Sequence, residues 1–552
     1  MNERPVEEGA RGDLRWGTTP QLLRAAAEAH GAREALVDRS AEPAVRLSFE
    51  ELRERADVLG AALVQQGIQP GDRVAIWAPN CWEWVVALFG LHSIGAVLVP
   101  LNTRYKGIEA ADIIRRSGAR MLFTVEGFLG NDYVSMLRGT GEDLPDLEHV
   151  VLLRDSGTRP EGTLTCAELL QSVTGPDGTA DVSEVERRVA ALEPSDTSDL
   201  IFTSGTTGRP KGVVQSHGQS LRAASDWADI VGLRADDRYL CINPFFHTFG
   251  YKAGILTSLM AGSTLVPMAT FDLEALPEVL AEERISMIPG PPTIYQSLLN
   301  HPGFDPSTVD TLRLAVTGAA VVPVELVERM RDTLGFETVV TAYGLTECCG
   351  FATICRHDDP PETIARTCGR AFPGVEVAIM DDERNLLPAD TPGEVVVRGY
   401  NVMQGYFEDP EQTAEAIDAE GWLHTGDVGV MDDDGYLRIT DRKKDMFIVG
   451  GFNAYPAEIE QLLLAHPQIA QVSVVGVPDE RMGEVGYAFV VPVSGTNPEP
   501  GELLAWAKEN MANFKVPRYA EVVEALPLNP SGKVLKYELR DRALTATGQE
   551  TA

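Results

Sequence analysis

The chain has 552 residues, of which 44% are hydrophobic and 23% are charged. That composition is ordinary for a globular protein and excludes an intrinsically disordered chain, and at about 150 residues per domain the length predicts three or four compact units. Lys and Arg number 47 against 82 Asp and Glu, and the formal net charge of −35 argues against partners such as nucleic acid or an anionic membrane surface.

The cysteines and the N-terminus indicate the compartment. Seven cysteines at irregular spacing favour reduced thiols, because disulfide frameworks are typical of short secreted chains with paired cysteines. The first residues, MNERPVEEGARGD, lack the apolar segment of a secretory signal peptide. We therefore expect a cytoplasmic location, with the cysteines in the core or lining a pocket.

Over residues 73–318, short apolar segments such as RVAIWAPN, RMLFTV, DLIFT and LRLAVTG alternate with helical patterns such as GIEAADIIRRSG. This alternation predicts an α/β fold with largely parallel strands, whose ends carry the binding loops. The most hydrophobic window, residues 82–101, contains Glu83 and His92. It predicts a buried helix followed by a buried strand, so we expect no integral membrane segment.

The pattern changes from residue 376 onward, where strands and turns dominate. Asp434-Gly435 lies between two alternating segments and predicts a hairpin. After TDRKKD, the segments MFIVGG, YPAEIEQLLLAHP, AQVSVVGV, YAFVVPV and GELLAWAKENM predict a small α+β unit. We place a domain boundary near residues 441–444.

One stretch, IFTSGTTGRPKGVVQSH from Ile201 to His217, is rich in glycines and hydroxyls around a single lysine. Glycines let the main chain approach a ligand, and exposed amides and hydroxyls can bind phosphate. Lys211 is followed by Gly212, whereas the nucleotide loop of phosphoryl-transfer enzymes has Ser or Thr after its lysine. The stretch therefore predicts a phosphate-binding loop of another kind, or a turn without a ligand.

Five segments in fixed order point to the function: FTSGTTGRPKGV, TAYGLTE, GWLHTGD, ITDRKKD and NPSGKVLK. Together they resemble the signature set of the adenylate-forming acyl-CoA synthetase superfamily, and the resemblance covers nearly the whole chain. It implies an α/β fold with Rossmann-like layers and a β-rich part in a large N-terminal adenylation domain, residues 1–441. It also implies a small, mobile α+β C-terminal domain, residues 442–552, which carries the catalytic lysine and the thiolation face.

The resemblance implies two half-reactions. A carboxylate first attacks the α-phosphate of ATP, giving acyl-AMP and pyrophosphate, and CoA then displaces AMP. Because charge develops on phosphate oxygens, the first step requires donors and cations around them. ATP, Mg²⁺ and CoA are the implied cofactors and co-substrates.

The resemblance also implies roles for individual residues in adenylation. Lys533 is the catalytic lysine, Thr346 contacts the α-phosphate, and Glu347 holds Mg²⁺. The remaining implied ATP contacts are the phosphate loop (Thr203, Ser204, Gly205, Thr206, Thr207, Gly208 and Lys211), the adenine site (Gly318, Ala319, Ala320 and Tyr343) and the ribose site (Asp427 and Arg442). Singly, Glu347, Asp427 and Lys533 are also compatible with a helix start, a turn and an exposed lysine.

The acyl pocket and the CoA path follow from the same resemblance. His247 is implied as a gate beside the carboxylate, and Gly344 is expected to leave room for a bulky acid. The other expected pocket residues are Phe249, Tyr251, Ala253 and the CCGFA segment that begins at Cys348; Lys444 is implied as the domain hinge, with Gly450 and Gly451 beside the pantetheine arm. Lys252 leaves two roles open, a stem that reaches the surface and a polar contact with substrate.

Within the superfamily, RYLCINPFFHTFGYKAGIL and GPPTIYQSLL resemble the actinobacterial ligases that activate the bicyclic propanoate left from sterol rings. A fatty acid is the main alternative substrate. Two alternative functions also stay open: acyl transfer to a carrier protein, and a luciferase-like oxygenase that acts on the adenylate. A homodimer is one assembly that the sequence leaves open.

Overall fold

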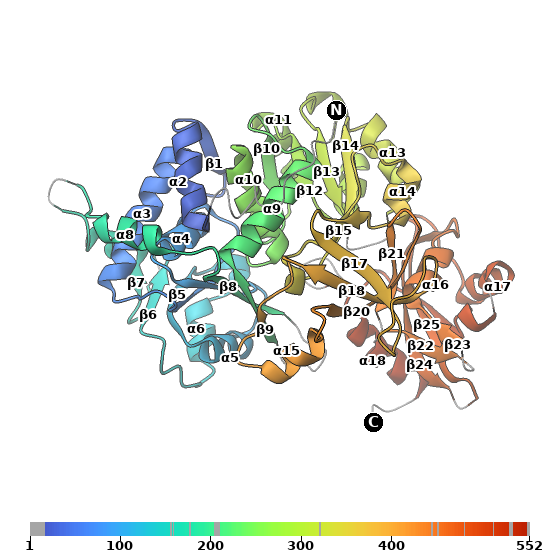
Figure 1. The fold of residues 1–552 in the computed structure, drawn as a ribbon. Helices are drawn as coiled ribbons and strands as arrows, with labels where there is room; N and C mark the ends of the chain where they lie inside the picture. The colour runs from blue at the N-terminus through green and yellow to red at the C-terminus, as the bar shows by residue number, and fades with distance from the viewer. Residues whose placement is uncertain are drawn as a thin grey trace.

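The computed structural model describes residues 17–154, 157, 159–175, 178–203, 210–318, 322–442, 445–449, 452–479, 481–511, 513–528 and 534–548. For residues 441, 442, 452, 453 and 458 it describes the main chain alone. Within these ranges the strands form two large sheets and two smaller ones, with helices packed against them (Figure 1).

The first large sheet contains nine described strands in the order β16-β15-β14-β13-β12-β10-β11-β1-β2. Neighbours from β14 through β1 are parallel, and the outer pairs are antiparallel. The strands are β1 (Glu34–Asp38), β2 (Val45–Ser48), β10 (Arg238–Cys241), β11 (Thr264–Pro267), β12 (Met287–Pro289), β13 (Leu314–Thr317), β14 (Thr338–Tyr343), β15 (Thr353–Ile354) and β16 (Arg370–Ala371).

The second large sheet contains eight described strands in the order β19-β9-β8-β4-β3-β5-β6-β7. It is parallel from β8 through β7, whereas β8 pairs with β9 and β9 with β19 in antiparallel fashion. The strands are β3 (Arg73–Trp77), β4 (Val97–Pro100), β5 (Ala119–Thr124), β6 (His149–Leu152), β7 (Leu164–Thr165), β8 (Thr197–Thr203), β9 (Lys211–Ser216) and β19 (Gly405–Tyr406).

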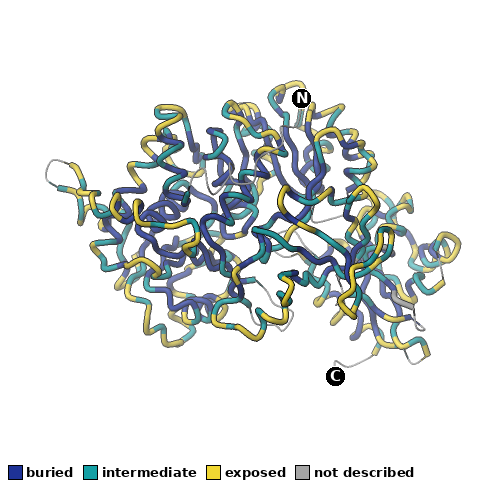
Figure 2. Tube along the Cα trace, in the orientation of Figure 1, coloured by how far each residue is buried: buried dark blue, intermediate teal, exposed yellow. Residues whose placement is uncertain are grey.

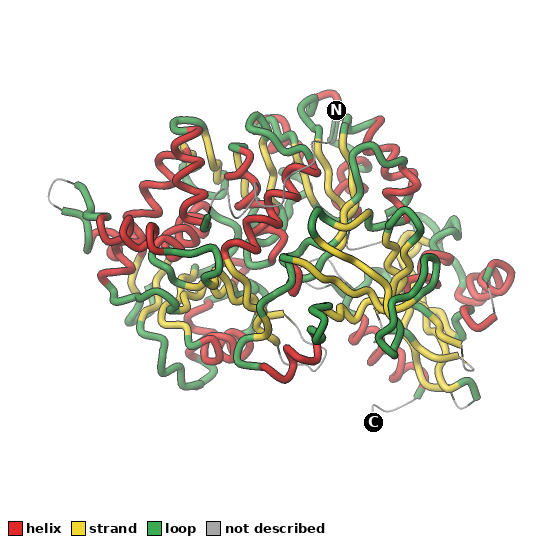
Figure 3. Tube along the Cα trace, viewed as in Figure 1, coloured by secondary structure: helices red, strands yellow, loops and turns green. Residues whose placement is uncertain are grey.

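The prediction of an α/β fold with largely parallel strands is confirmed by these two sheets. Helices flank their strands (Figure 3), and the strands form the buried interior (Figure 2). The helices of this part are α2 (Thr19–His30), α3 (Phe49–Gln65), α4 (Trp82–Ser93), α5 (Gly107–Ser117), α6 (Tyr133–Arg138), α7 (Cys166–Gln171), α8 (Ser183–Ala191), α9 (His217–Val231), α10 (Thr257–Ala261), α11 (Leu276–Glu282), α12 (Pro292–Leu299), α13 (Val324–Asp332), α14 (Pro361–Arg366) and α15 (Pro410–Ala416). Shorter or wider turns are η1 (Phe128–Gly130), the π-helix η2 (Phe249–Leu256), η3 (Pro306–Thr308) and η4 (Thr346–Cys348).

The hydrophobic window at residues 82–101 forms α4 followed by β4, as predicted, and both are buried. Within the described ranges, none of the helices has both the length and the apolar composition required to cross a bilayer.

Helix α9 shows how local sequence sets an element that borders the site. Ser216 caps its first turn, because the Ser216 hydroxyl accepts a hydrogen bond from the Gln219 amide at 3.3 Å. Gly232 ends the helix with φ 75°, a left-handed conformation that glycine adopts readily. The buried face between these caps carries Trp227 toward the π-helix.

The strand and turn region begins with an antiparallel sheet of four described strands, β17 (Val375–Met380), β18 (Gly393–Gly399), β20 (Leu423–Met431) and β21 (Leu437–Arg442). The predicted hairpin joins β20 to β21, where the Gly435 amide donates to the Asp432 carbonyl. Helix α15 interrupts this region and was not predicted.

The last part is the small α+β unit, at the right of Figure 1. Its described elements are β22 (Phe447–Val449), β23 (Phe452–Ala454), β24 (Ile469–Asp479), β25 (Gly483–Pro492), β26 (Tyr519–Val522), α16 (Pro456–Leu463), α17 (Pro500–Asn510), η5 (Asn513–Lys515) and α18 (Lys536–Thr547). Alternate residues of β24 face opposite sides of the sheet, so Val474 packs in one apolar cluster and Val475 in another. The domain boundary that we predict near residues 441–444 begins at the last two residues of β21, before the start of β22.

Candidate active site

The candidate phosphate loop connects two paired strands. Thr203 ends β8, Lys211 begins β9, and the two residues are directly opposite in the antiparallel ladder. The pairing therefore holds the two ends of the loop together. In the other large sheet, the parallel strands β13 and β14 end at Thr317 and Tyr343, and the segment that follows β14 carries Thr346 and Glu347.

Several predicted residues lie outside the described ranges. They are Ser204, Gly205, Thr206, Thr207, Gly208, Ala319, Ala320, Lys444, Gly450, Gly451 and Lys533. Arg442 is described by its main chain alone, and its Cα lies opposite that of Asp427 across the β20–β21 ladder. Gly318 directly follows β13.

The residues expected at adenine and ribose contact one another directly. The Tyr343 hydroxyl donates to Asp427 Oδ2 at 2.6 Å, although 84 positions separate them. Burial, and next the Asp427 carboxylate, raise the pKa of Tyr343 well above its usual value, so this hydroxyl stays protonated and remains a donor. The Asp427 amide also donates to the Thr425 hydroxyl at 3.1 Å, which fixes the main chain at this position. The tyrosine and the carboxylate thus form one unit across β14 and β20.

The residues expected at the phosphates are joined through Tyr406, which sequence analysis missed. Its hydroxyl donates to Glu347 Oε1 at 3.0 Å, and its ring lies 4.9 Å from Lys211 Nζ. Lys211 also donates to the side-chain oxygen of Gln412. Burial and the Glu347 carboxylate raise the pKa of Tyr406, which keeps it a donor at neutral pH. Nothing in the sequence distinguished it, because Tyr406 lies in the segment GYFEDPEQT, which matches none of the five motifs.

Thr346 is buried and contacts two other segments. Its hydroxyl lies 3.4 Å from that of Thr248, the residue before the π-helix, and its carbonyl accepts from Gln215 Nε2 at 2.6 Å. The candidate α-phosphate residue is therefore held by both the phosphate-loop strand β9 and the start of the acyl segment.

The candidate acyl segment forms the π-helix η2, a conformation that often occurs at functional sites. His247 is exposed just before it, and the Phe249 amide donates to His247 Nδ1 at 3.2 Å. The rings of Phe249 and Trp227 meet edge to face, with their centroids 6.0 Å apart. The Trp227 centroid lies 6.4 Å from that of Phe351 in the CCGFA segment. These three rings make one aromatic cluster.

Other predicted pocket residues are wholly buried. The ring centroid of Tyr251 lies 6.4 Å from that of Trp84, and Ala253 lies in the core. Burial raises the pKa of Cys348 to about 12, so its thiol is protonated at neutral pH. Among the described residues, no three His, Cys, Asp or Glu side chains gather as a metal-binding group.

Gly344 has a structural requirement of its own. A Cβ at this position would lie 2.1 Å from the Gly350 carbonyl oxygen, because the segment after Glu347 folds back over it. The space that a side chain would need is thus taken by main chain, and this close approach requires glycine at position 344; the expected role of Gly344 beside the acid stays a prediction.

Lys252 is fully buried in η2, so the expectation of a stem that reaches the surface is wrong. Its Nζ lies 3.3 Å from Asp199 Oδ1 and donates to the side-chain oxygen of Gln215. The cause is packing: η2 is enclosed by α9, α10 and β10, and the Lys252 side chain extends from it to Asp199 of β8 and Gln215 of β9.

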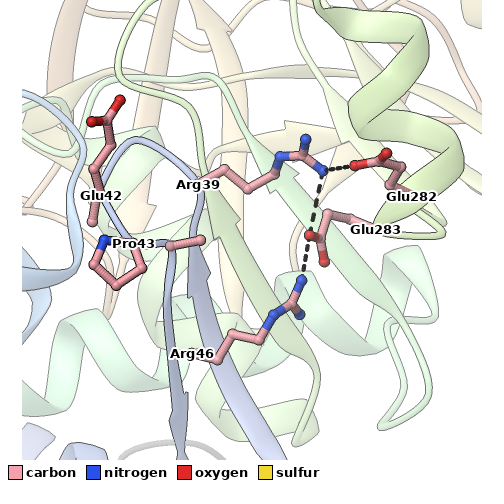
Figure 4. Close-up of a pocket in the computed structure, with 8 residues that line it drawn as sticks. Arg39, Glu42, Pro43, Arg46, Glu282 and Glu283 are labelled. Atoms are coloured by element: carbon pink, nitrogen blue, oxygen red, sulfur yellow. Dashed lines mark hydrogen bonds and ion pairs between the residues drawn. The ribbon is translucent and has the colours of Figure 1, made fainter.

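A surface hollow of about 420 Å³ lies elsewhere, beside the β1–β2 connection and α11 (Figure 4). Its guanidinium groups are already paired: Arg39 with Glu282 at 2.6 Å, and Arg46 with Glu283 at 2.6 Å. The hollow therefore offers no excess positive charge to a nucleotide, and none of the predicted site residues lines it.

Comparisons with known proteins identify the family of the chain. The AMP-binding enzyme family model matches residues 23–407, and the model of its C-terminal domain matches residues 458–533. The chain is 51% identical over 503 residues, 90% of its length and 94% of the relative, to the 3-[(3aS,4S,7aS)-7a-methyl-1,5-dioxo-octahydro-1H-inden-4-yl]propanoyl:CoA ligase of Mycobacterium tuberculosis. It is 48% identical over 526 residues, 95% of its length and 98% of the relative, to the ligase of the same name from Rhodococcus jostii.

A solved structure extends the similarity to the fold. The anthranilate CoA ligase AuaEII in complex with anthranoyl-AMP matches with a TM-score of 0.85 at 26% identity, covering 97% of this chain and 98% of that chain. The expected activity, AMP-forming ligation of an acid to CoA with ATP, is confirmed at the level of the reaction class. The chain belongs to the AMP-binding enzyme family.

Proposed function

We propose that the enzyme activates a bicyclic, sterol-derived propanoate. The acid's carboxylate oxygen attacks the α-phosphorus of ATP, and pyrophosphate leaves with the electron pair of the broken P–O bond. The CoA thiolate then attacks the acyl carbon and displaces AMP. The products are acyl-CoA, AMP and pyrophosphate.

One observation carries the adenylation step: two hydrogen-bonded side-chain pairs, Tyr343–Asp427 and Glu347–Tyr406, lie at and just after the end of β14. The Tyr343–Asp427 pair suits a nucleoside, because a carboxylate accepts hydrogen bonds from ribose hydroxyls. The Glu347–Tyr406 pair, with Lys211 against the Tyr406 ring, suits a metal-bound triphosphate. The two pairs support an ATP that runs from Asp427 toward Lys211.

Magnesium fits the residues on the phosphate side. Mg²⁺ is usually held by one or two carboxylates together with substrate phosphates and waters. Glu347 supplies one half-buried carboxylate, oriented by the Tyr406 hydroxyl at 3.0 Å. When bound there, the ion would neutralise charge on the phosphates, while Lys211 would add a second positive charge on the same side.

The ring-bearing substrate is supported by the relatives and by the aromatic cluster. Both relatives at about 50% identity are named as ligases of a methyl-dioxo-octahydroindenyl propanoate. The rings of Phe249, Trp227 and Phe351 pack into one apolar cluster beside the candidate acyl segment, with Phe249 half-buried and the other two rings buried behind it; such a cluster suits a bicyclic acid. Within the described part of the chain, the buried Trp227 Nε1 has no acceptor, and in this proposal a ring ketone of the bound acid would accept its hydrogen.

The remaining roles are part of the proposal. Lys533 would bridge the acid and the α-phosphate, Lys444 would act as the hinge, and Gly450 and Gly451 would border the pantetheine arm. Carrier-protein transfer and a luciferase-like oxygenase are less favoured, because the curated relatives at about 50% identity are both named CoA ligases.

The proposal is tested with purified enzyme, ATP, Mg²⁺, CoA and a panel of acids. We expect the bicyclic dioxo propanoate to give acyl-CoA and AMP with a kcat/KM at least about 10-fold above that of straight-chain acids. In the proposal, the enzyme contacts both the rings and a ketone of this acid, and straight-chain acids have neither. Acyl-CoA is measured by mass spectrometry. A preference for straight-chain acids would contradict the proposed substrate, and loading of a carrier protein without acyl-CoA would contradict the acceptor.

Trp227→Phe sharpens the substrate test. Phenylalanine retains an apolar ring but removes the N–H donor, so kcat/KM for the dioxo acid should fall about 10-fold. A ring acid of equal size without ketones should lose less than about 3-fold. Trp506→Phe is the matched control, because Trp506 lies in α17 against His466, away from the cluster. Equal losses for both acids would contradict the donor role.

A further inference from the structure

The buried side chain of Lys252 belongs to a polar network to which neither half-reaction, as proposed above, assigns a role. Lys252, Asp199 and Gln215 are each 0% exposed, and they come from η2, β8 and β9. Lys252 Nζ lies 3.3 Å from Asp199 Oδ1 and donates to the Gln215 side-chain oxygen. Burying a lysine and an aspartate is costly unless they are paired, so the position of this ammonium is closely constrained.

Asp199 is fixed independently of the lysine. Its Oδ2 accepts from the Ser198 hydroxyl at 2.6 Å, and the Ser198 carbonyl contacts His92 Nε2 at 2.9 Å. Asp199 Oδ1 has no hydrogen-bond donor of good geometry within the described residues, which leaves the Lys252 charge as its counterpart. The aspartate therefore compensates the lysine charge and anchors it to β8.

Gln215 connects the lysine to the adenylation segment. An ammonium group only donates hydrogen bonds and a main-chain carbonyl only accepts them. With Lys252 at the Gln215 oxygen, the amide nitrogen must face the other way, where it donates to the Thr346 carbonyl at 2.6 Å. Lys252 thus decides which of two amide orientations Gln215 adopts.

The far end of this network is the segment of Thr346 and Glu347, the proposed α-phosphate and magnesium residues. Gln215 fixes the carbonyl of Thr346, and the next residue presents its carboxylate to Tyr406. A second contact reaches Thr346 from the acyl side, since its hydroxyl lies 3.4 Å from that of Thr248. The phosphate-loop strands, the acyl segment and the adenylation segment therefore meet at one buried point.

We propose that Lys252 is a positioning residue for adenylation. By orienting the Gln215 amide it holds the Thr346 carbonyl, and with it the Glu347 carboxylate, in the geometry that the first half-reaction requires. This inference rests on the proposed function. It assigns no direct contact between Lys252 and the substrate, in contrast to the role left open by the sequence.

The test is a double-mutant cycle on the rate of acid-dependent pyrophosphate formation. Because Lys252→Met alone would leave the Asp199 charge buried and unpaired, the cycle is run in an Asp199→Asn background. The variants are D199N, D199N/K252M, D199N/Q215M and D199N/K252M/Q215M. In D199N the lysine side chain still carries hydrogens to donate to Gln215, so we expect kcat within about 3-fold of the parent.

Removal of the lysine and removal of the glutamine should each lower kcat by about 10- to 100-fold, which is the rate loss expected when a catalytic group is misplaced. Because both act through the same hydrogen bond, the triple variant should be no slower than D199N/Q215M. Multiplicative losses, or a wild-type kcat in D199N/K252M, would overturn the proposal.

Two measurements separate this outcome from other failures. Thermal unfolding of each variant shows whether the fold is retained, and a purely structural lysine would lower stability without the non-additive loss of kcat. If the parent enzyme itself forms no pyrophosphate with any acid, the proposed function fails. If the parent is active and the cycle is multiplicative, only the role of Lys252 fails.

Discussion

The nucleoside side and the phosphate side of the candidate site are built from different contacts. On the nucleoside side, Tyr343 and Asp427 lie in strands β14 and β20 and meet through one short hydrogen bond. On the phosphate side, Glu347 lies in the short turn η4 and accepts a hydrogen bond from Tyr406, whose ring lies beside Lys211. Rigid strands can hold a binding unit, whereas the phosphate side depends on a series of contacts, so changes there should affect the rate more than binding.

The largest expected effect comes from Glu347→Gln on the phosphate side. Loss of the carboxylate charge should slow pyrophosphate formation by about 100-fold or more, because charge developing on the phosphates is no longer balanced through the metal. The rate is measured at saturating ATP and acid, with thermal unfolding as the control for folding. A rate within about 3-fold of the parent would remove Glu347 from the proposed site.

On the nucleoside side, Tyr343→Phe should act on binding. The ring remains, but Asp427 loses the donor at 2.6 Å that orients it. We expect KM for ATP to rise about 5- to 10-fold with kcat changed less than about 3-fold, the pattern of a lost ground-state interaction. Initial rates over a range of ATP concentrations measure both. A fall in kcat at unchanged KM would contradict the claim that the nucleoside side acts on ATP binding and the phosphate side on the rate.

A smaller effect is expected from Tyr406→Phe. The ring beside Lys211 is kept and only the hydrogen bond to Glu347 is lost, so the Mg²⁺ concentration for half-maximal rate should rise about 3- to 5-fold. Tyr436→Phe is a matched control, because the Tyr436 hydroxyl donates to Asp359 at 2.6 Å outside the site. The same magnesium shift in both variants would show that the effect is not local.

The smallest expected effect on the site comes from His92, whose burial makes the stability of the fold depend on pH. Burial lowers the pKa of His92 to about 3, against about 6.5 in the unfolded chain. The folded state therefore binds fewer protons, so this contribution to stability is complete above about pH 6.5 and falls by about 1.4 kcal/mol per pH unit below it.

Urea unfolding at pH 7.0 and pH 5.5 measures this dependence. His92→Gln should show a shallower loss of stability between these pH values than the parent, because glutamine does not titrate. Equal losses in the two proteins would mean that His92 is not buried as a neutral side chain.

The sequence predicted the fold class, the helix and strand at residues 82–101 and the β20–β21 hairpin, because each depends on local periodicity or a turn. It also predicted Tyr343, Glu347 and Asp427 as site residues, since each lies in a recognisable motif. It could not predict the Tyr343–Asp427 contact, which depends on how two sheets pack. The π-helix η2 likewise depends on packing and has no sequence signal of its own.

Lys252 shows where more could have been inferred. Its two partners, Asp199 and Gln215, lie in the apolar strands DLIFT and GVVQS. Polar residues inside buried strands need partners, and three such residues in neighbouring elements suggest one network. Tyr406 and Gln412 carried no comparable signal, because a tyrosine and a glutamine beside a turn are common on a protein surface.

Pyrophosphate–ATP exchange in the absence of CoA tests the central claim most directly, because it reports formation of the acyl adenylate alone. The account predicts exchange that requires both the acid and Mg²⁺ and that Glu347→Gln slows by about 100-fold. Exchange that occurs only when CoA is added, or release of ADP in place of pyrophosphate, would contradict it.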